Sequence, residues 1–222
     1  MTDPRDFWTW FDQEAAPKLA VREVSFRKAF TYLDAIRTTR PVTIVETGCT
    51  RAAGNWGGDG QSSVLFDRYL AGCPEGSSGH AVDIDPAATA ECSRLVSDRI
   101  TVHTGDSVPV LRQIARTLAS QNRTIDLLYL DSFDVDWRHT VPSSAHHLKE
   151  LVSIVGSLRP DTLVMVDDCP TEARMIANDG GGFSLISTPQ IGGKGGMVAE
   201  YAAQVDATML FTHYQAAWFN MV

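Results

Sequence analysis

The stretch VMVDDCP, residues 164 to 170, leads a short apolar run directly into two adjacent aspartates. Asp167 and Asp168 repel each other, and removal from water strengthens the repulsion unless a cation or several hydrogen-bond donors compensate. The pair therefore predicts that this run ends at a place where such compensation is supplied.

Four runs of the same kind precede it along the chain: PVTIVETG (41–48), GHAVDID (79–85), RITVHTGD (99–106) and IDLLYLDS (125–132). Together with TLVMVDD (162–168), they lack polar alternation, which is typical of strands covered on both faces. Between them, segments 107–120 and 143–158 repeat apolar residues every three or four positions, which predicts helices. Alternation of strands and helices favours right-handed crossovers and a mainly parallel sheet.

The two ends of the chain complete the fold prediction. FWTWF (7–11) and SFRKAFTYLDAI (25–36) are expected to form helices ahead of the first strand. KGGMVAEYAAQV (194–205) is expected to form a helix, and ATMLFTHYQAAWF (207–219) a final strand or strand pair. We predict one Rossmann-like, doubly wound α/β domain whose mainly parallel sheet has seven strands or a truncated set of them. Residues 1–40 would be an N-terminal helical cap and residues 41–222 the domain proper.

The composition excludes several classes of protein. With 222 residues, 44% of them apolar and 21% charged, the chain has the make-up of one globular domain. A formal net charge of −8 argues against nucleic acid as a partner, because phosphate binding needs a basic surface. The sequence has no apolar run of the roughly 18 residues that a membrane span needs, no secretory signal in MTDPRDFWTW (1–10), and no CxxC pair for zinc or a disulfide framework. We therefore expect a soluble, cytoplasmic protein without a membrane partner.

Acidic residues end all five predicted strands. They are Glu46, Asp83 with Asp85, Asp106, Asp131, and Asp167 with Asp168. Each could simply cap the helix that follows, and Asp85 and Asp106 are the best candidates for that role. Because ligands bind outside the carboxyl ends of strands in an open α/β sheet, the shared edge predicts a binding site.

The segment after Glu46, ETGCTRAAGNWGGDGQSS (46–63), is a long glycine-rich loop. It has neither the GxGxxG pattern of dinucleotide sites nor a Walker lysine, and Glu46 would repel a phosphate. Lys194 in GGKGG (192–196) is predicted to be a solvated loop lysine. A carboxylate such as Asp83 at the end of the second strand suits the two hydroxyls of a ribose. A ribose, no pyrophosphate and a cationic group for Glu46 are the features of S-adenosylmethionine.

The ordered set ETGC, AVDIDP, TGDS, LYLDSFD and VMVDD, spread over residues 42–170, resembles class I S-adenosylmethionine-dependent methyltransferases. More narrowly, it is similar to metal-dependent O-methyltransferases of the catechol and macrocin types. The resemblance implies that Glu46 and the loop around Gly48 and Cys49 hold the methionine part of the cofactor. It implies that Asp83 binds the ribose, while Asp85 shares that ribose or caps its helix. The remaining implied cofactor contacts are Asp106 and Ser107 beside the adenine, and Asp131.

The resemblance also implies a divalent cation, Mg²⁺ or another, bound by Asp131, Asp167 and Asp168. Oxygen ligands of this kind suit Mg²⁺, and a cation would relieve the repulsion within the aspartate pair. The alternative is that Asp167 caps the next segment and Asp168 is solvated or faces the ribose, as in methyltransferases that need no metal.

The general base is where this sequence departs from the catechol type. Catechol-type enzymes have a lysine three residues after the acidic residue that ends the fourth strand, whereas this sequence has Asp134 at that position. Asp131, Asp134 and His139 are the catalytic candidates. His146 and His147 are alternatives, but neighbouring helix positions point about 100° apart, so we expect at most one of them to face the site.

These features predict a Mg²⁺-dependent O-methyltransferase that acts on a hydroxyl of a small molecule, such as a natural-product sugar or polyketide. The alternatives are a metal-independent small-molecule methyltransferase, a nicotinamide-dependent oxidoreductase and a non-catalytic cofactor-binding subunit. Specificity is expected from residues 178–196, predicted to be mobile, and from the aromatic residues Phe7, Trp8, Trp10 and Phe11. Those aromatic residues could instead pack against the domain or a second subunit, which leaves a homodimer open.

Overall fold

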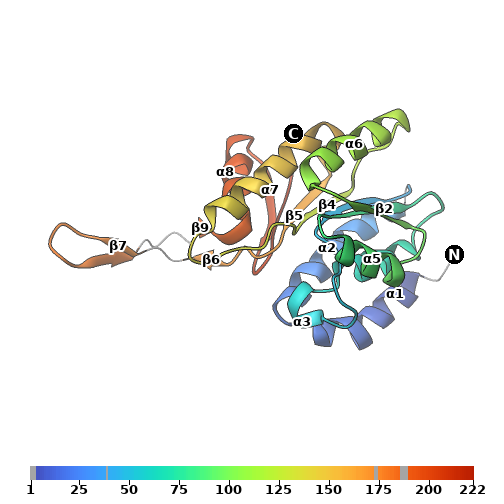
Figure 1. Cartoon of the computed structure of the whole chain (residues 1–222), viewed down its shortest axis with the longest axis horizontal. Coiled ribbons are helices and arrows are strands. Elements are labelled where there is room, and N and C mark those ends of the chain that lie inside the picture. Colours follow the sequence, from blue (N-terminus) through green and yellow to red (C-terminus); the bar gives the residue numbers. More distant parts are fainter. Residues whose placement is uncertain (1–3, 39, 173–174, 186–189) are drawn as a thin grey trace.

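A seven-stranded sheet runs through the centre of the molecule (Figure 1). The computed structural model describes residues 4–38, 40–172, 175–185 and 190–222. The strand order is β10-β11-β5-β4-β1-β2-β3. The strands are β1 (Thr43–Thr47), β2 (Ser78–Asp83), β3 (Ile100–Thr104), β4 (Leu127–Leu130), β5 (Leu163–Val166), β10 (Thr208–Thr212) and β11 (Ala216–Phe219).

Strands β1 to β5 are parallel to one another, and β11 runs antiparallel to both of its neighbours, β5 and β10. This arrangement confirms the predicted α/β fold with a mainly parallel, doubly wound sheet. Every residue of β1, β4 and β5 is buried, which explains why these strands lack polar alternation.

Helices cover both faces of the sheet (Figure 1). They are α1 (Pro4–Trp10), α2 (Glu23–Arg37), α3 (Trp56–Asp59), α4 (Ser62–Leu70), α5 (Pro86–Leu95), α6 (Ser107–Ser120), α7 (Val141–Ile154) and α8 (Gly196–Gln204). Residues of α1, α2, α4 and α5 share one apolar core on one face, and residues of α6, α7 and α8 share a second core on the other. The carboxyl ends of the central strands lie between these two layers.

The N-terminal residues form the predicted helices and are part of the core. Helix α1 continues into a π-helical turn (Phe11–Ala15), and shorter turns lead on to α2. Phe7 and Phe11 are buried and contact the ring of Phe30 on α2, while Trp8 donates a hydrogen bond from Nε1 to Asp34 (2.8 Å). Of the two predicted roles for Phe7 and Phe11, packing against the domain is therefore confirmed.

The segment after β5 forms two small strand pairs before α8. β6 (Thr171–Glu172) pairs with β9 (Gln190–Ile191), and β7 (Met175–Ala177) pairs with β8 (Phe183–Leu185). Part of the glycine-rich segment 178–196 that was predicted to be mobile, residues 186–189, lies outside the described residues. Its last part, the turn Gly193–Gly195, is buried.

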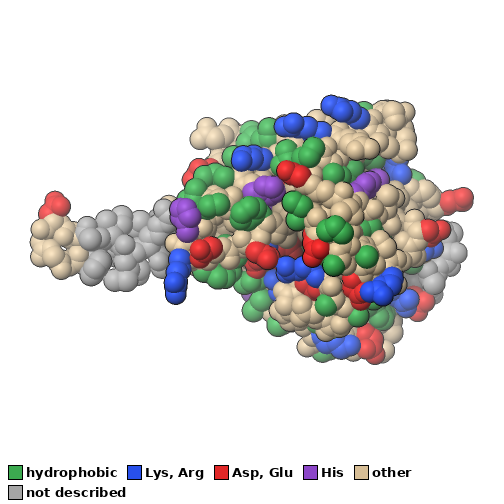
Figure 2. Space-filling view, viewed as in Figure 1, with side chains coloured by type: hydrophobic (Ala, Val, Ile, Leu, Met, Phe, Trp, Pro, Cys, Tyr) green, Lys and Arg blue, Asp and Glu red, His purple; other side chains and the backbone are tan. Residues whose placement is uncertain are grey.

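All four cysteines are buried and free. Figure 2 shows acidic, basic and hydrophobic side chains interspersed on the face that Figure 1 presents. Among the described residues, no helix combines the length and apolar character needed to cross a bilayer.

We predict that Phe30→Ala destabilises the protein by about 3–5 kcal/mol, because it removes a fully buried ring that contacts five other aromatic rings. Urea denaturation checks the value. Val24→Ala on the same helix is the control, since Val24 is 39% exposed. Equal losses in the two variants would contradict the placement of α2 in the core.

Candidate active site

The candidate site lies where the strand order reverses, between β1 and β4. This position is the usual ligand crevice of an open α/β sheet. Gly48, which follows β1, has a φ of +75°, and a Cβ there would come within 2.5 Å of the Asp131 carbonyl oxygen. Glycine is therefore required if the chain leaving β1 is to pass so close to the end of β4.

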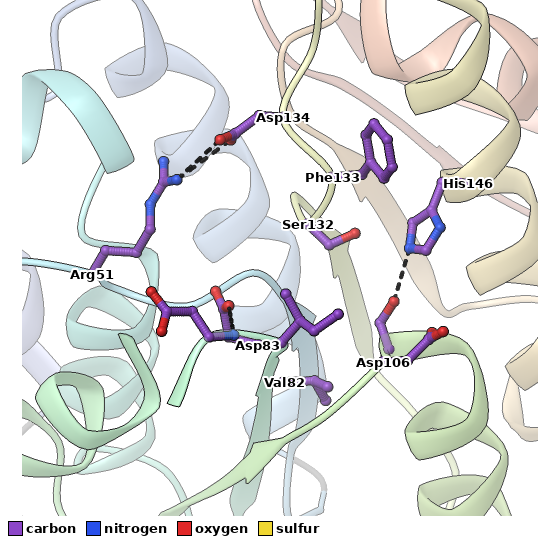
Figure 3. A pocket seen from close by; sticks show the side chains of 11 residues that line it. Arg51, Val82, Asp83, Asp106, Ser132, Phe133, Asp134 and His146 are labelled. Carbon is purple, nitrogen blue, oxygen red and sulfur yellow. Dashed lines mark hydrogen bonds and ion pairs between the residues drawn. The ribbon is translucent and has the colours of Figure 1, made fainter. Parts of the chain in front are cut away.

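A cavity of about 510 Å³ opens at this edge (Figure 3). Its lining comes from the ends of β2, β3 and β4, the start of α7 and the loop after β1. The residues are Arg51, Val82, Asp83, Ile84, Asp85, Asp106, Ser107, Ser132, Phe133, Asp134 and His146. Of the acidic strand ends predicted from the sequence, Asp83, Asp85 and Asp106 line this cavity.

Asp83 occupies the centre of the cavity wall. Its carboxylate accepts hydrogen bonds from the backbone N–H of Asp85 (2.9 Å) and, more weakly, of Cys49 (3.3 Å). Asp85 and Asp106 cap helices α5 and α6 by accepting from Ala87 N and Val108 N, as predicted for them. Both also line the cavity, so capping does not remove them from the site.

The opposite wall contains a buried polar network around Glu150. His146 Nε2 lies 3.0 Å from Ser107 Oγ and 3.3 Å from Glu150 Oε1. Glu150 also accepts from Ser132 Oγ (2.6 Å) and Thr47 Oγ1 (3.0 Å). The hydrogen bond to Glu150 raises the pKa of His146, and burial acts against that rise.

Only His146 of the histidine pair faces the cavity, as expected. His147 is fully buried, and its Nδ1 lies 2.7 Å from the Ser143 carbonyl oxygen. Burial lowers the pKa of His147 to about 4.

A smaller hollow adjoins the main cavity, lined by Gly48, Cys49, Arg51, Asp59, Asp83, Asp131 and Ser132. Glu46 does not line either hollow. It is buried next to α4, where Ser62 Oγ donates to Oε2 (2.8 Å) and Oε1 has no hydrogen-bond partner among the described residues. Burial raises the pKa of Glu46 well above its usual value.

The carboxylates of Asp131, Asp167 and Asp168 meet beside this hollow, each offering one oxygen within 4.8 Å of the others. We call these three residues the carboxylate trio. Asp168 has a φ of +48°, a left-handed conformation that aspartate tolerates better than most residues. The backbone at the end of β5 is therefore unusual where the two adjacent aspartates come together.

Two cations and a phenol surround the carboxylate trio. Arg22 Nε donates to Asp167 Oδ2 (2.8 Å), and the Arg22 guanidinium stacks 4.9 Å from the ring of Tyr214. Lys194 Nζ lies 2.5 Å from Asp131 Oδ1 and 3.1 Å from Asp168 Oδ2. Tyr214 donates its hydroxyl to Asp168 Oδ1, which also lies 3.4 Å from Arg22 Nη2.

The prediction for Lys194 is wrong. The residue is 2% exposed and not solvated, because the turn Gly193–Gly195 places it under α7 and against the end of β5. Burial alone would lower the pKa of Lys194, but the charges of Asp131 and Asp168 outweigh burial and raise it. For Asp168, burial acts to raise the pKa, but the charge of Lys194, the hydrogen bond from Tyr214 and the charge of Arg22 together lower it. Burial raises the pKa of Asp131 well above its usual value, and the charge of Lys194 acts against that rise. The three oxygen neighbours of Lys194 Nζ match the three N–H donors of an ammonium group, so we assign the proton to Lys194.

The other two catalytic candidates, Asp134 and His139, do not belong to the carboxylate trio. Asp134 is exposed and forms an ion pair with Arg51 Nη1 (3.2 Å) at the mouth of the cavity (Figure 3). His139 is exposed in the turn after β4 and does not line the cavity. Of the three catalytic candidates, only Asp131 belongs to the carboxylate trio.

Sequence analysis did not assign five polar residues to the site: Arg22, Arg51, Glu150, Lys194 and Tyr214. Only Lys194 had a signal, because a lysine between two glycine pairs is typical of a tight turn. The others lie on elements whose position depends on tertiary packing.

Comparisons with solved structures show the fold that this site belongs to. A proposed O-methyltransferase from Klebsiella pneumoniae superposes over 98% of this chain and 97% of its own, with a TM-score of 0.52 and 16% identity. The MycE methyltransferase from the mycinamycin biosynthetic pathway, in a complex with Mg and SAH, superposes over 86% of this chain with a TM-score of 0.50 and 17% identity. That overlap is 48% of the MycE chain, and it is 31% in another MycE structure, so this chain spans half of its length or less.

The chain thus has the Rossmann-like fold of class I methyltransferases, as the sequence resemblance implied. Models of known protein families give no match, and neither does a search of the curated proteins.

We predict that His147 makes the protein less stable in mild acid. In the folded protein His147 stays neutral down to a pH of about 4. In the unfolded chain the same imidazole takes up a proton below a pH of about 6.5. The stability that depends on neutral His147 is present above pH 6.5 and is lost as the pH falls towards 4, by about 2 kcal/mol at pH 5. Chemical denaturation of wild type and His147→Gln at pH 7 and pH 5 should show a smaller pH effect in the variant. His213→Gln is the control, because His213 is exposed; the same pH effect in all three proteins would contradict the prediction.

Proposed function

We propose that this chain is an S-adenosylmethionine-dependent O-methyltransferase that acts on a hydroxyl of a small molecule. The observation that carries the proposal is the cavity at the ends of β1 to β4, with Asp83 in its wall and Gly48 beside it. The shared fold with class I methyltransferases supports it.

The residues present fit the cofactor. Asp83, at the end of β2, suits the hydroxyls of a ribose. Ile84 and Phe133 are 73% and 50% exposed in the cavity lining and offer apolar surface to an adenine, with Asp106 and Ser107 beside it.

The smaller hollow near Gly48 and Cys49 suits the methionine part. Behind it, Glu46 keeps one buried carboxylate oxygen without a hydrogen-bond partner among the described residues, and that oxygen is suited to an amine. A dinucleotide site binds a pyrophosphate at a GxGxxG loop, and the loop beside these hollows lacks that pattern.

The residues also support the chemistry of methyl transfer. When bound, S-adenosylmethionine supplies an activated methyl group on a positively charged sulfur. Asp131 lines the smaller hollow. There its carboxylate would accept a hydrogen bond from the acceptor hydroxyl and take its proton as the new O–C bond forms, while the S–C bond to the methyl group breaks and a neutral thioether leaves. Lys194 holds the other side of the Asp131 carboxylate at 2.5 Å and fixes its direction. Positioning of this kind supplies much of the acceleration in a displacement reaction.

The acceptor is proposed to be a hydroxylated natural product such as a sugar or a polyketide. MycE is named for the mycinamycin biosynthetic pathway, and we extend that class of acceptor to this chain as part of the proposal. At the mouth of the cavity, the exposed Arg51–Asp134 pair offers both a donor and an acceptor for hydroxyl groups.

A divalent cation does not fit the carboxylate trio as it is arranged. Mg²⁺ takes about six oxygen ligands at roughly 2.0–2.1 Å. Four of the six carboxylate oxygens of the trio already have a cationic or phenolic partner, and Asp167 Oδ1 is the buried oxygen without one among the described residues. This observation favours the metal-independent alternative, and none of the roles proposed for Asp83, Asp131 and Lys194 depends on Mg²⁺.

Asp83→Ala is predicted to weaken S-adenosylhomocysteine binding by at least about tenfold, because it removes a charged acceptor from the cavity wall. Isothermal titration calorimetry measures the change. Asp98→Asn is the matched control, since Asp98 is exposed just before β3, at the opposite end of that strand from the cavity. Unchanged affinity in Asp83→Ala would remove the ribose contact from the proposal.

Turnover tests the whole proposal. The protein, S-adenosylmethionine and a panel of hydroxylated sugars, polyketides and catechols are incubated together, and mass spectrometry follows S-adenosylhomocysteine and a product heavier by one methyl group. Asp131→Asn is expected to keep cofactor binding and to lose most turnover. Tight NAD binding without S-adenosylmethionine binding would support the oxidoreductase alternative. Cofactor binding without turnover on any acceptor would support the non-catalytic one.

A further inference from the structure

The ammonium of Lys194 is fully satisfied inside the carboxylate trio. An ammonium group has three N–H donors. Lys194 Nζ has three oxygen neighbours at 2.5, 3.1 and 3.3 Å, which are Asp131 Oδ1, Asp168 Oδ2 and the Asp131 carbonyl oxygen. The position between Asp131 and Asp168 is therefore occupied by a charge of the protein itself.

The backbone around Lys194 fixes this position. Lys194 N donates to the Asp168 carbonyl oxygen (3.0 Å), and Gly192 N donates to the Pro170 carbonyl oxygen (3.1 Å). Gly193 has a φ of +56°, and a Cβ at this residue would collide with the Asp168 carbonyl oxygen. The turn therefore lies against the chain that follows β5, and it holds Lys194 where the residue is only 2% exposed.

Charge balance leads to the same conclusion. Three carboxylates with Lys194 and Arg22 leave one net negative charge in the group. A divalent ion bound by Asp131 and Asp168 would have to lie next to the buried ammonium, where like charges repel strongly. Such an ion has to displace Lys194, which would then leave a buried ammonium without its partners.

We infer that Lys194 is a resident cation that takes the place of a divalent metal ion in the carboxylate trio, so that the chain needs no added metal. This inference rests on the proposed function for its role in methyl transfer, but the occupancy of the trio does not depend on that function. Lys194 is a positioning residue here, because it acts through Asp131 and Asp168.

Metal binding by the full-length protein tests the inference without an activity assay. Electron paramagnetic resonance of Mn²⁺ measures the free ion in the presence of wild type, Lys194→Met and Lys194→Arg. Lys194→Met keeps most of the side-chain length without the charge and is expected to bind Mn²⁺ at least about tenfold more tightly than wild type. Lys194→Arg keeps the charge and is expected to behave like wild type. The double variant Lys194→Met with Asp131→Asn should lose the gain, which would locate the new site at the trio.

Wild-type protein that binds Mn²⁺ at the trio as tightly as Lys194→Met does would overturn the inference, and so would turnover that EDTA abolishes and Mn²⁺ restores. If Lys194→Met does not fold, as judged by circular dichroism, weak Mn²⁺ binding and EDTA-resistant turnover of wild type remain the expected results. Calorimetry with S-adenosylhomocysteine is run on every variant and on wild type. Absence of binding would overturn the proposed function. The Mn²⁺ results test only the role of Lys194.

Discussion

The site depends on the neutralisation of buried carboxylates at the ends of β4 and β5. Asp167 is fully buried next to Asp168, and an uncompensated pair of this kind would be strongly destabilising. Arg22 and Lys194 provide the compensation from two distant parts of the chain. The N-terminal turns, the loop before α8 and the sheet edge are thereby held in one arrangement, and the cavity beside them has a fixed wall.

Much of the architecture could be predicted from local pattern alone. The five apolar runs identified β1 to β5, because buried parallel strands lack polar alternation. The meeting of Asp83, Asp106 and Asp131 at one edge followed from the geometry of parallel strands, whose carboxyl ends lie together. Asp85 and Asp106 were expected as helix caps, since capping depends on residues only a few positions apart.

What the sequence could not provide were the long-range partners. Arg22 is 145 residues from Asp167, and Lys194 is 63 residues from Asp131. A lysine among glycines resembles a solvated loop residue until the left-handed Gly193 places the turn against β5. In the same way, whether His139 or His146 reaches the cavity depends on how α7 packs on the sheet, and no local pattern fixes that packing.

The separation of these partners along the chain has a consequence during synthesis. A nascent chain that has emerged as far as β5 already contains the aspartate pair and Arg22, but not Lys194 or Tyr214. Until Lys194 leaves the ribosome, the carboxylates of Asp131 and Asp168 lack their ammonium partner, and water or ions in the cell must screen them. Consolidation of this edge therefore has to wait for residues 194 and 214, and a product shortened before them would expose an acidic, incompletely closed surface to chaperones.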